Sequence, residues 1–152
     1  MASLPVFSSV SPRFGLPLLY AAQAQKELCV NEALAVIDAM LGCAVEGIAT
    51  VPPASPVNGT NWLVGSGGTG AWAGRDGSVA ACQAGNWVFI APRDGMNVLN
   101  RATGQTLLYA GGWQAPAQPA APAGGATVDV EARTAIAALI AALQQAGIFS
   151  TS

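Results

Sequence analysis

The apolar residues of this chain change their spacing along the sequence, and this change narrows the folds open to it more than any other feature. Near the N-terminus they follow alternating steps of four and three residues: Val30, Leu34, Ile37, Leu41, Ala44 and Ile48. This heptad spacing is typical of a helix with a narrow apolar seam. We predict a helix from about Ala21 to Val45, in an N-terminal helical segment of residues 21–48. The seam fits packing on its own domain as well as on partner helices.

The same spacing returns near the C-terminus, where the stepped positions are Ala132, Ile136, Leu139, Leu143 and Ala146. Thr127 or Asp129 can cap this helix, and Gly147 can end it. Residues 115–126, rich in Pro, Ala and Gly, predict an extended, semi-rigid linker before the helical segment 127–152. A short Ala-rich helix is marginal alone in water. We therefore predict that it is an oligomerisation helix.

Between these helices the spacing is β-like. Short runs such as "NWLVG", "NWVFIA" and "TLLYAGGWQ" are separated by Gly-rich turns, after a proline-rich connector that begins at Thr50. Residues 49–114 thus predict a small antiparallel β-module, either a meander or a sandwich. The motif Arg-Asp-Gly occurs at residues 75–77 and again at 93–95, which indicates either a weak internal duplication or a favoured turn. The chain as a whole is predicted to be an α+β protein.

Charged residues are scarce. They make up 9% of the chain, against 52% hydrophobic residues, whereas a soluble domain carries roughly 25%. The scarcity favours a surface that is covered by other chains. The net charge of −2 and the scattered Lys and Arg argue against binding of nucleic acid. No apolar run reaches the roughly 18 residues of a membrane-spanning helix, so we expect no membrane insertion.

The residues offer little for catalysis or cofactor binding. The chain has no histidine and three cysteines, Cys29, Cys43 and Cys82. These cysteines lack zinc-site spacing and are expected to be small core residues. Asp76 and Asp94 are expected to make local hydrogen bonds in their turns. The "GSGGTG" loop lacks the context of a phosphate site. We predict no catalytic residues, no metal, no cofactor and no enzymatic activity.

Four tryptophans lie in or beside the β region, and they are the candidates for binding. An aromatic face on a small β-module can stack on a sugar ring or anchor a partner. Trp87, in an alternating run, is expected in the core. Trp72, set between glycine turns, is the best candidate for an exposed ring, and Trp113 with Tyr109 is the second. These three residues are the predicted contacts for a glycan or protein partner.

Residues 1–20 mix Pro, Ser and apolar residues without a helical or strand period, and we expect them to be a docking arm. The run "LPLLYAAQAQKEL" has the apolar character of a secretory signal. However, Arg13 is the first cation and Pro17 interrupts the apolar run, which does not fit a signal peptide. Docking is therefore the favoured interpretation.

Several motifs are shared with a known group of domains. They are Leu16–Leu19, Gln23–Glu27, Asn31–Leu34 and the sequence from Pro52 to Gly95 with its Pro, Gly and Trp residues, together with the last helix. In these motifs the chain resembles a family of uncharacterised domains from tailed phages and gene transfer agents. The resemblance implies a component of a virion, most often of the tail fibre or the distal tail, assembled in the cytoplasm of the bacterial host. It also implies association with other virion proteins.

We accordingly predict a homo-oligomer, a trimer by analogy with fibres of this class, whose helices anchor and whose β-module projects. Its predicted oligomerisation residues are Val30, Leu34, Ile37, Leu41, Ile136, Leu139 and Leu143. The first alternative is a carbohydrate-binding module that contacts polysaccharide on the host surface. The second is a capsid decoration or head-fibre protein, and the third is an accessory module of a secreted enzyme.

Overall fold

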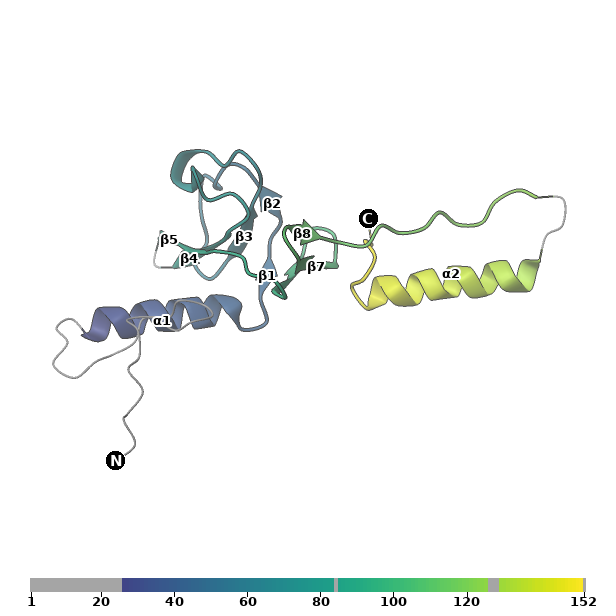
Figure 1. The fold of residues 1–152 in the computed structure, drawn as a ribbon, viewed down its shortest axis with the longest axis horizontal. Helices are drawn as coiled ribbons and strands as arrows, with labels where there is room; N and C mark the ends of the chain where they lie inside the picture. Colours follow the sequence, from purple (N-terminus) through teal and green to yellow (C-terminus); the bar gives the residue numbers. More distant parts are fainter. Residues whose placement is uncertain (1–25, 84, 126–128, 152) are drawn as a thin grey trace, which may run out of the picture.

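The computed structural model describes residues 26–83, 85–125 and 129–151. The molecule is elongated, with one helix beneath a β-module and the other projecting from its far side (Figure 1). The elements are α1 (Lys26–Met40), β1 (Ala44–Val45), β2 (Ile48–Ala49), β3 (Asn61–Val64), the 3₁₀ turn η1 (Gly70–Trp72), β4 (Val79–Gln83), β5 (Asn86–Ile90), β6 (Asn97–Asn100), β7 (Gln105–Tyr109), β8 (Trp113–Gln114) and α2 (Val130–Gln145). The predicted docking arm, residues 1–20, lies outside the described residues.

The eight strands form two four-stranded sheets, which confirms the predicted α+β class. The β4 sheet has the order β2-β3-β4-β5, and the β7 sheet has the order β1-β6-β7-β8. Each sheet is an antiparallel meander of three strands with a two-residue parallel strand at one edge, so the sheets are mixed rather than purely antiparallel. Both parallel strands come from the short segment that follows α1.

The first helix is shorter than predicted, and its end is a correction to the segment 21–48. It ends at Met40, and Gly42 then takes a φ of 59°, which is the left-handed conformation that favours glycine. Ala44 and Ile48, the last two positions of the heptad pattern, lie in strands. Leu99 donates its N–H to the carbonyl of Cys43. Pairing with β6, which is far away in the sequence, thus replaces the last helical turns.

Both sides of α1 are apolar, and they have different environments. Ala39 is buried in the main core, and Val36 and Met40 pack against that core. By contrast, Leu34 and Leu41 of the predicted seam are exposed, Leu41 by 74%. The helix therefore closes its own domain with one side, and most positions of the predicted seam are exposed.

The main core lies between the two sheets and the inner side of α1. It contains Val45 of β1, Leu63 of β3, Val79 of β4 and Val98 of β6. Ala80, between two inward residues of β4, faces the other way and joins a second, aromatic cluster. Period-2 alternation places neighbouring residues on opposite faces. The β4 sheet is therefore covered on both faces.

The cysteines with described side chains, Cys43 and Cys82, are buried free thiols, which confirms their expected place in the core. Burial raises the pKa of the Cys43 thiol to about 11. The thiol therefore stays protonated and unreactive near neutral pH.

The C-terminal region forms an arm, by which we mean residues 115–125 together with α2. The Asp129 carboxylate accepts the N–H of Ala132 at 2.8 Å, so Asp129 is the N-cap. Gly147 (φ 69°) ends the helix, with its N–H bonded to Gln144 O and the Ile148 N–H bonded to Leu143 O. This pair of bonds is a Schellman motif. Both predicted helix boundaries are confirmed, and residues 115–125 contain no regular element.

The segment after α2 returns to β7 and fixes the base of the arm. The Thr106 N–H donates to Gly147 O at 2.6 Å. The side-chain amide of Gln105, which is buried, donates to Pro116 O at 3.0 Å and to Ile148 O at 3.1 Å. One glutamine thus holds the start of the linker and the end of the helix.

Candidate functional site

Trp72 is fully buried, which corrects the expectation that its ring is exposed. Its ring lies 5.1 Å from that of Trp87 in an edge-on contact and 6.4 Å from that of Trp62. The 3₁₀ turn η1 carries the ring beneath the outer face of the β4 sheet. That face also carries Trp62, Trp87 and Phe89 around the small Ala80. Trp72 packs among them, which the flanking glycines did not indicate. A buried ring presents no face to a sugar.

Tyr109 and Trp113, the other predicted contacts, form a pair at the end of the β7–β8 hairpin. They are cross-strand partners, and their rings meet edge-on at 5.2 Å. Both are half-buried, and the Trp113 indole N–H donates to Gly77 O at 2.8 Å. That bond joins the β7 sheet to a loop of the β4 sheet, so it fixes the direction of the indole ring.

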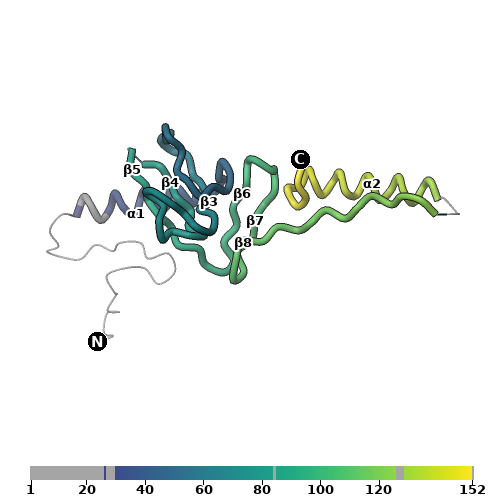
Figure 2. Tube along the Cα trace, turned by 90° about the horizontal axis from the view of Figure 1, so that it is seen from above, coloured from purple at the N-terminus to yellow at the C-terminus, as the bar shows by residue number. Residues whose placement is uncertain are grey.

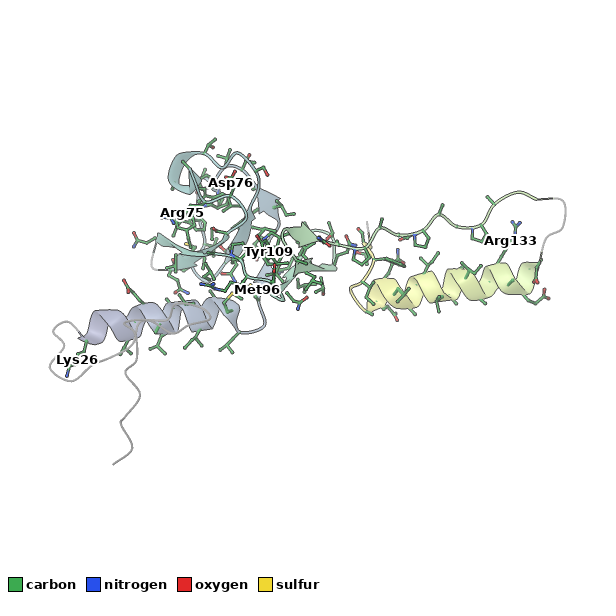
Figure 3. The ribbon with its side chains drawn as sticks, in the orientation of Figure 1. Lys26, Arg75, Asp76, Met96, Tyr109 and Arg133 are labelled. Carbon is green, nitrogen blue, oxygen red and sulfur yellow. The ribbon has the colours of Figure 1, made fainter. Side chains whose placement is uncertain are left out.

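The pair lines a cavity of about 420 Å³ between the two sheets. Figure 3 labels Tyr109 in the β7 sheet and Asp76 in the loop above it. The cavity is lined by Ile48, Leu63, Val64, Gly65, Ser66, Asp76, Gly77, Tyr109, Gly112 and Trp113. Apolar and aromatic walls with a few fixed polar groups are typical of small-ligand sites. We call this cavity the inter-sheet pocket.

Asp76 supplies the carboxylate of the inter-sheet pocket. Its two oxygens accept the backbone N–H groups of Gly67 and Gly68 at 2.8 and 2.9 Å. These two bonds hold the pKa of the carboxyl below its usual value of 3.8, because hydrogen bonds to the charged form favour it. The glycine-rich loop thus binds a carboxylate of its own chain.

Asp76 was predicted to make hydrogen bonds within its own turn, and this prediction is wrong. Its side chain instead accepts hydrogen bonds from the glycine-rich loop. The Arg-Asp-Gly turn itself is closed by the Ser78 N–H on Arg75 O at 3.0 Å. The second copy of the motif behaves alike: Asp94 accepts the N–H of Gly111 at 2.9 Å. Each copy precedes the first strand of an antiparallel hairpin, β4–β5 or β6–β7. In both copies the aspartate therefore bonds outside its own turn.

Close packing keeps the glycine-rich loop against Asp76. A Cβ on Gly68 would lie 2.7 Å from Trp72 O and 2.9 Å from a methyl carbon of Val64. Such distances are too short for any carbon atom, so the loop needs glycine there. Nothing in the sequence indicated that Gly67 and Gly68 hold Asp76. The run of glycines did indicate a loop in which the backbone approaches another group closely.

The predicted oligomerisation residues fall on two separate surfaces. Leu34 and Ile37 are exposed on α1, and Leu41 is exposed directly after the helix ends. We call these three residues the α1 seam. Ile136 and Leu139 are exposed on α2, by 43% and 64%. The remaining two, Val30 and Leu143, are half-buried. The structure does not bring the two surfaces together, because the helices lie at opposite ends of the molecule (Figure 1).

The described residues also limit the chemistry of the chain. Within them no three His, Cys, Asp or Glu side chains gather in a way that could hold a metal ion. Asp76 and Tyr109 are the ionisable residues that line the inter-sheet pocket. Across the same parts of the chain, no helix has the length and hydropathy to cross a membrane.

Comparison with known proteins finds one family. Residues 30–114, which include most of α1 and all eight strands, match the family described as "Protein of unknown function (DUF2793)". No curated protein matches the chain.

Proposed function

Because the chain belongs to the DUF2793 family of proteins of unknown function, we propose a function from its own surfaces. We propose that it is a homo-oligomeric structural component of a phage or phage-like particle, in the tail fibre or the distal tail. In this role the helices anchor the chain, and the β-module projects from the particle. The chain is assembled in the cytoplasm of the bacterial host and contacts other virion proteins.

One observation carries this proposal, namely the pair of uncovered apolar surfaces at opposite ends of an elongated molecule. The α1 seam lies at one end, and Ile136 with Leu139 lies at the other. Single exposed apolar residues are common, whereas apolar stripes on helices mark sites of interaction with other proteins. Two such stripes on one small chain suit a part that joins neighbours on both sides.

The location on a particle rests on the resemblance of the motifs in Gln23–Glu27 and Asn31–Leu34 to those of phage and gene-transfer-agent domains. A capsid decoration or head-fibre protein would share the same surfaces, and it is the alternative location. The third alternative, a module of a secreted enzyme, has no surface that specifically favours it.

The location is tested with particles induced from the strain that encodes the chain. The particles are banded on a density gradient, washed in high salt and probed for the chain. We expect the chain to band with the particles at a fixed ratio to the major capsid protein. Immunogold labelling then separates tail from head. Recovery of the chain only in the soluble cell fraction would overturn the virion proposal.

A second candidate function, binding of a host surface polysaccharide, is favoured by the inter-sheet pocket. Its ring pair offers a stacking surface, and the fixed Asp76 carboxylate offers an acceptor for sugar hydroxyl groups. Trp113 and Tyr109 are the residues expected to contact the sugar.

Calorimetric titration with purified surface polysaccharide tests this second function. We expect Tyr109→Ala to weaken binding at least about tenfold, because each tenfold loss needs only about 1.4 kcal/mol. Leu99→Ala is the matched control, because Leu99 is an exposed leucine of the neighbouring strand β6 and does not line the inter-sheet pocket. Equal affinities for both variants, each shown to be folded by circular dichroism, would remove the pocket from consideration.

A further inference from the structure

The C-terminal arm consists of two antiparallel parts, the irregular linker and the helix α2. Residues 115–125 run back along α2, and both views show the two side by side (Figures 1 and 2). Gln118 accepts from the Gln144 side chain at 2.9 Å near the base of the arm. Arg133 donates to Pro122 O and Gly124 O near its tip (Figure 3). The linker is thus held along most of the helix.

The lengths of the two halves agree with this pairing. From Arg133 to Gln144 an α-helix rises about 16 Å, at 1.5 Å per residue. From Gln118 to Gly124 a proline-rich chain in the polyproline conformation extends about 19 Å, at 3.1 Å per residue. The linker is therefore long enough to reach both contacts on α2.

The linker covers only one face of α2. Arg133, Ile140 and Gln144 share that face because they are spaced by seven and four residues, and Ile140 is the buried residue of the helix. Ile136 and Leu139 lie roughly a quarter turn away and stay exposed. We call the heptad positions Ala132, Ile136, Leu139, Leu143 and Ala146 the α2 stripe.

The α2 stripe continues into a groove at the base of the arm. The groove has a volume of about 540 Å³ and lies between β7, β8, the start of the linker and the end of α2. Ala146 belongs to both the stripe and the groove, and Leu108, Pro116 and Ile148 supply apolar walls. Stripe and groove together form one apolar surface along the arm.

This surface carries no charge. The sequence from Ala102 to Val128 contains no charged side chain, and neither does the sequence from Thr134 to Ser152. A partner that is recognised by ion pairs would find nothing to pair with here. A partner that carries charges would lose their hydration against an apolar wall. The matching surface must therefore be uncharged and apolar, as the α2 stripe and its groove are.

We propose that the occupant of the α2 stripe and its groove is the same surface of further copies of this chain, packed in parallel. This proposal rests on the proposed function, and it names the surface through which the homo-oligomer forms. Parallel packing follows from the charges at the tip, Asp129, Glu131 and Arg133. In an antiparallel pair these charges would lie against the uncharged groove of the other copy, whereas in a parallel bundle they stay in water.

The test is the native mass of the full chain by light scattering after size exclusion. We expect a mass that is a multiple of 15.2 kDa, and the monomer mass for Leu139→Asp. Ala141→Asp is the matched control. It places the same charge on the opposite side of the same helix, at an exposed position, and should keep the wild-type mass. A monomeric wild type overturns the proposal, and so does an equal effect, or no effect, of the two variants.

Cysteine cross-linking tests the direction without a disruptive charge. Ala132→Cys and Ala146→Cys should each form disulfide-linked dimers with themselves under mild oxidation, above the wild-type background. Cross-links that form only when the two variants are mixed would indicate antiparallel packing and would overturn the proposal. A chain that is monomeric yet still bands with particles would keep the virion role and remove only the arm interface.

Discussion

The tight fit of Gly68 leads to a prediction for the substitution Gly68→Ala. The new Cβ would lie 2.7 Å from Trp72 O, 2.9 Å from Val64 Cγ1 and 3.1 Å from an Asp76 carboxylate oxygen. The carbonyl oxygen cannot yield easily, because it already accepts the Arg75 N–H at 3.0 Å. The glycine-rich loop must therefore move away, and it carries with it the two N–H groups that hold Asp76.

The expected loss of stability follows from these contacts. Extra carbon atoms in a packed site cost about 1–3 kcal/mol. The change from glycine to alanine also restricts the unfolded chain, which returns about 0.4–1 kcal/mol where the native backbone suits alanine. We expect a net loss of about 1–2 kcal/mol. For a folded unit of the size of residues 26–114, each kcal/mol of lost stability lowers the melting temperature by about 4–8 °C.

Urea unfolding followed by tryptophan fluorescence measures this loss, because all four tryptophans lie in the β-module. Gly112→Ala is the control. Gly112 also lines the inter-sheet pocket, but no atom lies within 4 Å of its added Cβ, so this variant should match or slightly exceed the wild type. If Gly68→Ala proves as stable as Gly112→Ala, the steric argument is wrong, and with it the claim that packing holds the loop on Asp76.

Three further substitutions or measurements follow from the described contacts. The pKa of Asp76 in the folded chain lies below 3.8. The contribution of its carboxylate to stability is therefore full above that value and is lost as the pH falls through the folded pKa. The difference in urea midpoint between the wild type and Asp76→Asn should shrink from pH 5 to pH 2. Gln105→Leu leaves two carbonyl groups without their donor. Elastase should therefore cleave residues 115–125 about tenfold faster, which corresponds to about 1.4 kcal/mol. Gln145→Leu, at an exposed position of α2, should not change the rate. In a Cys29→Ser background, Cys43 and Cys82 should react with a thiol reagent at pH 8 only at the rate of unfolding, since both are buried and the pKa of Cys43 is about 11.

The elements with local signals were predictable from the sequence. The C-terminal helix begins at an aspartate cap and ends at a glycine with positive φ, and both signals lie within a few residues of the helix ends they determine. The strands of the β-module also matched their apolar runs. For the helix ends, the decisive interactions are made between neighbours in the sequence.

The features set by distant contacts were not predictable. Ala44 and Ile48 fit a helical spacing, and only the pairing of Ala44 with Leu99 and of Ile48 with Leu63 decides for strands. The glycines around Trp72 suggested an exposed loop, because sequence spacing does not show that the face around Ala80 needs a large ring. Asp76 lies in the turn before β4 and Tyr109 lies in β7 of the other sheet, so only the folded chain brings the two pocket residues together.

The two parallel edge strands have a consequence for how the chain folds during synthesis. β1 and β2 leave the ribosome early, directly after α1, yet Val45 must wait for Asn100 before its strand can pair. The β4 sheet can form first, but the buried side chain of Val45 stays without its cover until β6 emerges. The segment that joins both sheets therefore makes them one cooperative unit. A chain halted before Asn100 should remain a target for chaperones, although most of its strands have already been made.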